Sequence, residues 1–301
     1  MEIRQVSGLE DQRVCTDIFM RAMDGLHPRQ DQQPMDTSDM EWLPASLAYF
    51  AEGDPEGLVL AVEDGAPVAF GCAMRRDRFW FLSYLFVLPD AQGKGVGRAL
   101  LDHLLPPEAE RSSMDLATVV ESGQPVSTML YSRYGIVPQT PLYWMTHLPG
   151  IDGLPPLAAD LRARPIDLET DGEAIDAFDR ELLGYARPQD HRMWVRQSKT
   201  SRVYHGHDRS LAGYGYHGSD DWLTPLAARD EALVGGMIRD LLEAHTGATD
   251  DVVVQLAGGS VVLLPQLLAA GMRSDEGTKM IYCSTGRVPG PGYLLYAAYH
   301  P

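Results

Sequence analysis

The 301-residue sequence contains only three cysteines, at positions 15, 72 and 283. Their odd number and wide spacing argue against a disulfide framework and against paired-cysteine metal sites, so we expect buried thiols and no bound metal. No apolar run approaches the roughly 20 residues of a membrane-spanning helix. The first 15 residues carry charges where a signal peptide would have its apolar core, and we therefore expect a cytoplasmic protein.

Basic residues are also scarce, with 25 Lys and Arg against 42 Asp and Glu and a net charge of −17. This balance opposes binding to nucleic acid or to an anionic membrane, because either partner needs a basic face. It would attract a cationic substrate, although an acidic surface also serves solubility alone. The hydrophobic fraction of 45% is that of a globular protein, and the length is sufficient for two domains that each bury a core.

The most informative stretch runs from residue 79 to 105 and reads as a strand, a glycine-rich loop and an amphipathic helix. Its glycines, at 93, 95 and 97, match neither the G-x-G-x-x-G fingerprint of dinucleotide-binding folds nor the P-loop. Three glycines before a helix nevertheless leave several backbone N–H groups exposed at the positive end of the helix dipole. The stretch therefore predicts a phosphate-binding loop.

Two motifs in this part of the chain resemble those of a known superfamily. Val87 and Pro89 form V-x-P, and the Q-x-x-G-x-G that follows them resembles the acyl-coenzyme A (acyl-CoA) pyrophosphate loop of the GNAT N-acyltransferases. Farther along, Leu130-Tyr131-x-x-Tyr134-Gly135-Ile136 is similar to the L-Y-x-x-x-G-F signature of the same superfamily. One departure is Gln124, which stands where many members have Asn. The chain is thus identified as GNAT-like, with an acyl-CoA as the implied co-substrate.

The resemblance implies roles for residues at the end of the strand and in the loop. Backbone N–H groups would hold the pyrophosphate, two basic side chains would add charge, and the strand would pair with the pantetheine amide. The implied cofactor-binding residues are Leu85, Phe86, Val87, Gln92, Gly93, Lys94, Gly95, Val96, Gly97 and Arg98.

The resemblance also implies direct acyl transfer from the thioester to an amine. Tyr131 is the implied general acid, because a phenol is suited to protonating the departing thiolate, and Tyr134 is its competitor. The strand before the loop lacks the carboxylate that often serves as base. Ser83 could position a water and Glu121 could accept a proton; a neutral amine relayed by water, or the carboxylate of Pro301, is also open.

A cluster of Pro and Gly at 149–156 predicts a linker, and we place the domains at 1–150 and 157–301. The same order of elements recurs after the linker. We therefore expect an α/β protein of two tandem GNAT-like domains, each a mixed, mostly antiparallel sheet flanked by helices. The second domain should be degenerate, because residues 227–231 have no glycine and two acids where the first domain has its loop. The last strand, 293–300, is expected to complete the first sheet.

The sequence thus favours an acyl-CoA-dependent N-acyltransferase, with acetyl-CoA as the foremost donor and a primary amine of a small cationic molecule as acceptor. The polar segment 27–39 is a candidate lid over that substrate. We expect a monomer or a homodimer. Two alternatives stay open: a non-catalytic acyl-CoA sensor or interaction protein, and another thioester reaction on the same fold, such as decarboxylation or hydrolysis.

Overall fold

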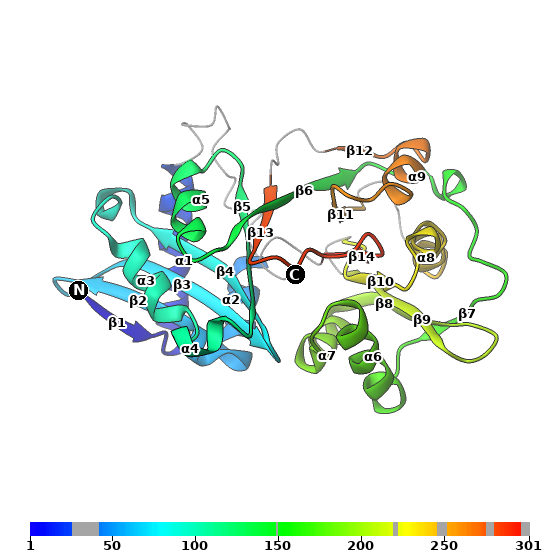
Figure 1. The fold of residues 1–301 in the computed structure, drawn as a ribbon, viewed down its shortest axis with the longest axis horizontal. Coiled ribbons are helices and arrows are strands. Elements are labelled where there is room, and N and C mark those ends of the chain that lie inside the picture. Colours follow the sequence, from blue (N-terminus) through cyan, green and yellow to red (C-terminus); the bar gives the residue numbers. More distant parts are fainter. Residues whose placement is uncertain (26–41, 149, 219–221, 246–251, 275–279, 296–301) are drawn as a thin grey trace. The chain divides into compact units, whose positions relative to one another are not determined.

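The computed structural model describes residues 1–25, 42–148, 150–218, 222–245, 252–274 and 280–295 (Figure 1). The chain divides into two compact units, unit 1 (Met1–Val119 with Pro125–Ile136) and unit 2 (Val120–Gln124 with Val137–Pro301). Unit 2 includes the strand after residue 136 that the sequence-based division assigns to the first domain. The boundary near residue 155 therefore stays a prediction, and the candidate lid at 27–39 lies outside the described residues. No helix of the described chain is long and apolar enough to cross a membrane.

The sheet of unit 1 is mixed, as predicted. Its strands lie in the order β1 (Glu2–Gln5), β2 (Leu58–Glu63), β3 (Ala66–Arg76), β4 (Phe79–Val87) and β5 (Asp115–Glu121). Neighbouring strands are antiparallel except β4 and β5, which are parallel. The chain returns from β4 to β5 through helix α3, as a parallel crossover requires.

Helices cover both faces of this sheet. They are α1 (Gly8–Asp24), α2 (Trp42–Gly53), α3 (Val96–Leu104), α4 (Glu108–Arg111) and α5 (Pro125–Ser132), with short 3-10 turns at Pro55–Gly57 and Pro89–Ala91. Phe86 of β4 packs on Phe19 of α1, with ring centroids 4.5 Å apart. A Cβ at Gly71 of β3 would meet Leu85 of β4 and Leu104 of α3. Since successive strand residues face opposite sides, α1 and α3 lie on opposite faces.

A β-bulge interrupts β4 at Ser83. In the register with β3, Tyr84 lies opposite Cys72 while Leu82 lies opposite Ala73, which leaves Ser83 as the extra residue. The parallel ladder between β4 and β5 ends at the same level, at the pair Leu82 and Thr118. The Thr118 hydroxyl donates a 2.8 Å hydrogen bond to the Leu82 carbonyl there. Beyond this point β4 continues beside β3 without its β5 ladder.

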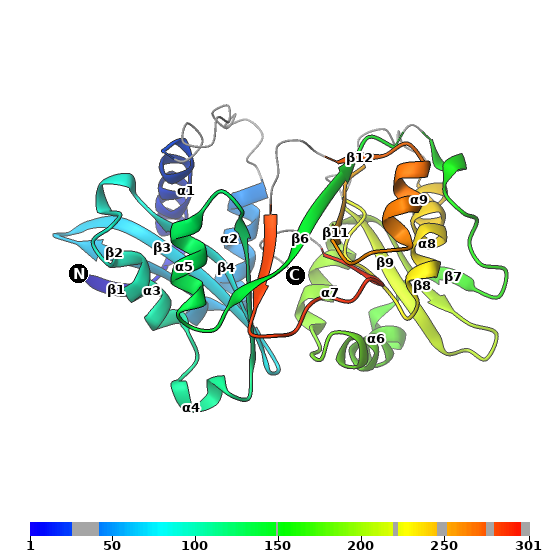
Figure 2. The same cartoon turned by 45° about the horizontal axis from the view of Figure 1, so that its top comes forward.

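The sheet of unit 2 repeats much of this arrangement. Its order is β13 (Met280–Ser284), β6 (Val137–Thr146), β11 (Val254–Ala257), β14 (Tyr293–Leu294), β10 (Leu226–Ala228), β9 (Leu211–Gly218), β8 (Ser198–His205) and β7 (Arg162–Pro165), with β12 (Arg273–Ser274) also paired to β6. Its helices are α6 (Leu168–Leu182), α7 (Pro188–Gln197), α8 (Glu231–Glu243) and α9 (Leu263–Ala269), with a 3-10 turn at Ile151–Gly153. Figure 2 shows α6 and α7 side by side. The order of two helices, three strands and a helix matches that of unit 1, which confirms the predicted tandem arrangement of two α/β folds, while the domain limits stay a prediction.

The last strand differs from the expectation. Tyr293 and Leu294 pair with β10 and β11, both in unit 2, and do not return to the sheet of unit 1 (Figure 1). Backbone hydrogen bonds hold it there, from the Ala228 amide to the Gly292 carbonyl at 2.8 Å and from the Leu295 amide to the Gln255 carbonyl at 3.2 Å, and the missing Cβ of Gly292 permits this close approach. Residues 296–301, including the carboxylate of Pro301, lie outside the described chain.

Candidate active site

The glycine-rich loop joins the end of β4 to the first turn of α3. Gly93 and Gly95 have φ of 75° and 87°, in the left-handed region where glycine avoids the penalty of a Cβ. Gly95 is the N-cap of α3 and provides no side-chain cap. The amide of Ala99 donates to the Gly95 carbonyl at 3.0 Å, so the amides of Val96, Gly97 and Arg98 precede the first helical hydrogen bond.

The outer surface of the loop is open. A Cβ built on Gly93 or Gly95 meets no atom within 4 Å, whereas one on Gly97 would touch Val87 at 3.5 Å and Leu130 at 3.9 Å. Gln92 fixes the loop to the strand, because its side-chain Nε2 donates to the Val87 carbonyl at 3.0 Å. Its backbone amide donates to the Pro89 carbonyl at 3.2 Å, so the amides that can face an anion begin at Gly93.

The two predicted basic side chains are exposed on this surface, Lys94 in the loop and Arg98 in the first turn of α3. Arg98 pairs with Asp102 one turn later at 3.7 Å, a weak exposed ion pair. An anion at the loop could therefore draw either charge toward it at little cost. Their roles stay predictions.

The end of β4 supplies the second element of the site. Leu85, Phe86 and Val87 are half-buried and paired on one side with β3. Their other backbone edge extends past the end of the β5 ladder at Leu82. An extended ligand can add to such an edge through main-chain hydrogen bonds.

Two tyrosines near the end of α5 are distinguished by their surroundings. The Tyr134 hydroxyl donates to Asp102 at 2.5 Å. Burial, followed by this hydrogen bond and the Asp102 charge, raises the pKa of Tyr134. A phenol bound to a carboxylate gives up its proton less readily. Tyr131 is almost fully buried, with 6% of its surface exposed, and its role as general acid stays a prediction.

The candidate bases are placed differently. Ser83 sits on the β4 bulge, where its Oγ is buried and has no hydrogen-bond partner among the described residues. A buried hydroxyl without a partner is costly, so a polar atom of a ligand or water should satisfy it. Glu121 is the last residue of β5 and falls in unit 2, whereas Ser83 and Tyr131 belong to unit 1. The role of Glu121 stays a prediction.

Together these features fit an acyl-CoA. The loop offers amides and open space to a pyrophosphate, the β4 edge offers a ladder to a pantetheine arm, and the unpartnered Ser83 hydroxyl lies where that ladder starts. Among the described residues, no group of three or more His, Cys, Asp or Glu gathers as a metal site would require.

The sequence reading missed a buried polar network in unit 2. Asp179 accepts from Arg187 Nε at 2.9 Å and lies 2.9 Å from His191 Nε2, and all three side chains are almost fully buried. Two tyrosine hydroxyls on β9 complete it, with Tyr214 bonded to Asp179 and Tyr216 to His191. The sequence did contain a signal for this network. Tyr214 and Tyr216 are two residues apart and so lie on the same strand face, and buried phenols need polar partners.

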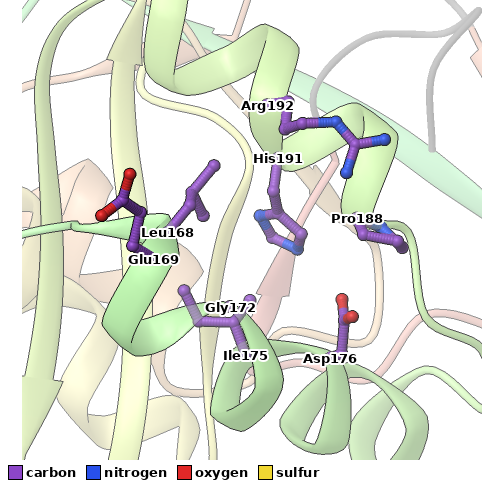
Figure 3. Close-up of a pocket in the computed structure, with 8 residues that line it drawn as sticks. All are labelled: Leu168, Glu169, Gly172, Ile175, Asp176, Pro188, His191 and Arg192. Atoms are coloured by element: carbon purple, nitrogen blue, oxygen red, sulfur yellow. The ribbon is translucent and has the colours of Figure 1, made fainter.

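Beside this network, a hollow of about 230 Å³ lies between α6 and α7 (Figure 3). It is lined by Leu168, Glu169, Gly172, Ile175, Asp176, Pro188, His191 and Arg192. Figure 3 shows the His191 ring directed toward Gly172 and Ile175. None of the predicted cofactor residues lines this hollow, so it is separate from the glycine loop.

Residues 20–136 match the model of the acetyltransferase (GNAT) family. A comparison with curated proteins finds no match. Among solved structures, an acetyltransferase candidate from Pyrococcus horikoshii shares 15% identity at a TM-score of 0.72, covering 100% of this chain and 95% of that one. A GNAT-type N-acetyltransferase from Sphaerobacter thermophilus shares 16% at 0.59, covering 94% and 95%. A tandem GNAT protein from the clavulanic acid biosynthesis pathway shares 16% at 0.56, covering 95% and 100%. At these identities the structural likeness shows the fold.

Proposed function

Residues 20–136 of this chain are a GNAT acetyltransferase domain within a tandem GNAT fold, and from that premise we propose that the protein transfers an acetyl group from acetyl-CoA to a primary amine of a small cationic molecule. The observation that carries the proposal is the meeting, at the end of β4, of an open glycine loop and a strand edge freed from its neighbour.

The loop provides the binding energy for the pyrophosphate. Amides from Gly93 to Arg98 lie at the start of α3, where the helix dipole is equivalent to roughly half a positive charge. Each hydrogen bond to a charged phosphate oxygen contributes about 1.5–3 kcal/mol. Lys94 and Arg98 would add a screened attraction at the exposed surface.

The strand would orient the thioester. A pantetheine arm paired with residues 85–87 would extend along β4 toward the bulge at Ser83, next to Leu82, the last residue of β4 that pairs with β5. The unpartnered Ser83 hydroxyl could there hold a water or a carbonyl oxygen. The proposed role of β4 is therefore to fix the reacting carbonyl in one orientation.

The reaction follows from these positions. The amine nitrogen forms a bond to the acyl carbon, the bond from that carbon to sulfur breaks, and the amine loses one proton. Tyr131 donates its phenolic proton to the leaving thiolate, a step to which a phenol is suited. A water held near Ser83 takes the proton from the amine and passes it to solvent, and Tyr131 regains a proton from solvent before the next turnover.

The acceptor is proposed to be cationic because the chain carries a net charge of −17. An acidic protein draws oppositely charged substrates toward it at low ionic strength. Raised salt should then increase the KM for a polyamine more than the KM for a neutral amine. We place the reaction in the cytoplasm and assign it to a monomer or homodimer.

The test is to incubate the protein with acetyl-CoA and a panel of polyamines, aminoglycosides and amino acids while following free thiol. Thiol release that requires the amine, with an acetylated product of matching mass, supports the proposal. Release without an acceptor would indicate thioester hydrolysis, and tight binding without release would indicate a sensor. Either of these results would refute acetylation of the amines in this panel by the protein.

A further inference from the structure

In both domains, two neighbouring strands begin in parallel and then separate, but what lies between them differs. In the first domain, β4 and β5 pair in parallel and separate beyond Leu82. In the second, the corresponding strands also begin with a parallel contact, a bridge between Trp222 and Val253 reinforced by a 2.9 Å bond from the Leu223 amide to the Val253 carbonyl. Beyond it, β10 and β11 pair with β14 instead of with each other.

The backbone of β14 is bonded on both edges. Leu294 lies opposite Leu226 of β10 and opposite Leu256 of β11, antiparallel to each. The Ala228 amide donates to the Gly292 carbonyl at 2.8 Å, and the Leu295 amide donates to the Gln255 carbonyl at 3.2 Å. A four-residue segment thus replaces the pairing that the two flanking strands would otherwise make.

A side chain anchors this segment. Tyr293 is 1% exposed, and its hydroxyl accepts a hydrogen bond from Arg187 at 2.5 Å. The Arg187 guanidinium also lies 5.0 Å from the centre of the tyrosine ring, within cation–π range. Asp179 holds that guanidinium from the other side at 2.9 Å. The tyrosine therefore lies in a buried charged socket, formed by the Arg187 guanidinium and the Asp179 carboxylate that pairs with it.

Two carboxylates, Asp230 and Glu231, lie at the start of α8, where the first domain has its glycine loop. Asp230 caps α8 by accepting from the Ala232 amide at 2.9 Å. Glu231 extends to α9, where its Oε1 accepts from the amides of Val262 at 3.0 Å and Leu263 at 2.9 Å. Two carboxylates with satisfied partners at a helix start would repel a pyrophosphate.

We propose that the space between β10 and β11 in the sheet of the second domain is a binding site for an extended apolar peptide with a tyrosine anchor, and that residues 292–295 of the same chain occupy it. Main-chain hydrogen bonds on both edges hold the peptide, and the socket of Arg187 selects the tyrosine. The inference concerns only the second domain and does not depend on acetyl transfer by the first.

A single methyl group tests this in the full-length chain. Gly292→Ala places a Cβ 2.4 Å from the Ala228 carbonyl oxygen, whereas Gly290→Ala meets no atom within 4 Å and serves as the matched control. In Gly292→Ala, hydrogen exchange at the Ala228 and Leu295 amides should accelerate on the order of tenfold or more, because an overpacked contact must separate. Gly290→Ala should exchange as the wild type does.

Rescue in trans then tests the binding site itself. A synthetic peptide of residues 290–295 (GPGYLL), in excess over the Gly292→Ala protein, should restore protection of the Ala228 amide in a saturable manner. The same peptide with Phe for Tyr should restore less, since it lacks the hydroxyl that Arg187 bonds. Equal exchange in the two glycine variants would overturn the proposed occupancy. Lost protection that no peptide restores would overturn the binding site.

Discussion

Replacing Gly95 by alanine separates the binding role of the glycine loop from its backbone strain. Gly95 has φ of 87°, and a Cβ there contacts nothing within 4 Å. Gly65, in the turn between β2 and β3, has φ of 80° and equally open surroundings. Both substitutions should therefore destabilise the same unit by a similar amount, about 1–2 kcal/mol from the left-handed backbone alone.

Only Gly95→Ala should weaken acyl-CoA binding. Its methyl group projects into the space that a pyrophosphate needs, and losing one hydrogen bond to a charged group costs about 1.5–3 kcal/mol. That corresponds to a dissociation constant roughly 10- to 150-fold higher. Calorimetric titration with acetyl-CoA measures the affinity, and urea unfolding of both variants verifies that their stabilities match. If Gly95→Ala and Gly65→Ala bind acetyl-CoA equally well, the loop does not hold the pyrophosphate.

Four further substitutions test the general acid, the glycine loop and the buried network of the second domain. Tyr131→Phe should lower kcat by about 10²-fold or more with little change in the KM for acetyl-CoA, while Tyr134→Phe should not; steady-state thiol release compares them, and equal kcat values would remove Tyr131 from the mechanism. Gln92→Ala frees the loop from the last carbonyl of β4 and should raise the acetyl-CoA dissociation constant less than Gly95→Ala does, since it removes a neutral hydrogen bond of about 0.5–1.5 kcal/mol. Burial alone would raise the pKa of Asp179, but Arg187 and its other partners outweigh burial and hold that pKa below its ordinary value. The resulting stabilisation is complete above an unfolded-state pKa of about 3.9 and is lost as pH falls through the lower folded-state value. Urea unfolding of the wild type should therefore show a free energy of unfolding that falls in acid, and Asp179→Asn should lack this dependence. The variant should also be less stable by about 3–5 kcal/mol, because its buried guanidinium has lost the carboxylate partner.

The loop and its helix could be predicted because their signals are local. Three closely spaced glycines require no distant partner to define a turn, and α3 begins at Val96, within the predicted loop-to-helix transition. The pattern also located the carboxylates that replace the loop in the second domain. The sequence pattern could not predict which groups these carboxylates bind, because Glu231 accepts from amides that lie about thirty residues away in the chain.

The wrong prediction for the last strand concerns its partners, which are far away in the sequence. Tyr293 and Leu294 read correctly as strand residues, but an apolar strand alone does not specify its neighbours, and its partners depend on the close approach of Gly292 to Ala228. β6 begins at Val137 and contains Pro138 and Pro141, because each proline removes only one backbone donor and the register with β13 shifts between Tyr282 and Cys283.

The buried network was missed for the opposite reason. Asp179 and Arg187 carry charges that a sequence pattern assigns to the solvent face, whereas in the folded chain both side chains are fully buried and pair at 2.9 Å. The candidate base has the same limitation. Ser83 became a specific candidate only when the register placed it on a bulge with an unpartnered hydroxyl.

We propose one acyl-CoA site per chain, at the glycine loop of the first domain. Calorimetric titration of the full-length protein with acetyl-CoA tests it most directly. We expect a stoichiometry of one per chain, with binding weakened by Gly95→Ala and unchanged by Gly65→Ala. A stoichiometry of two, or no binding at all, would contradict it.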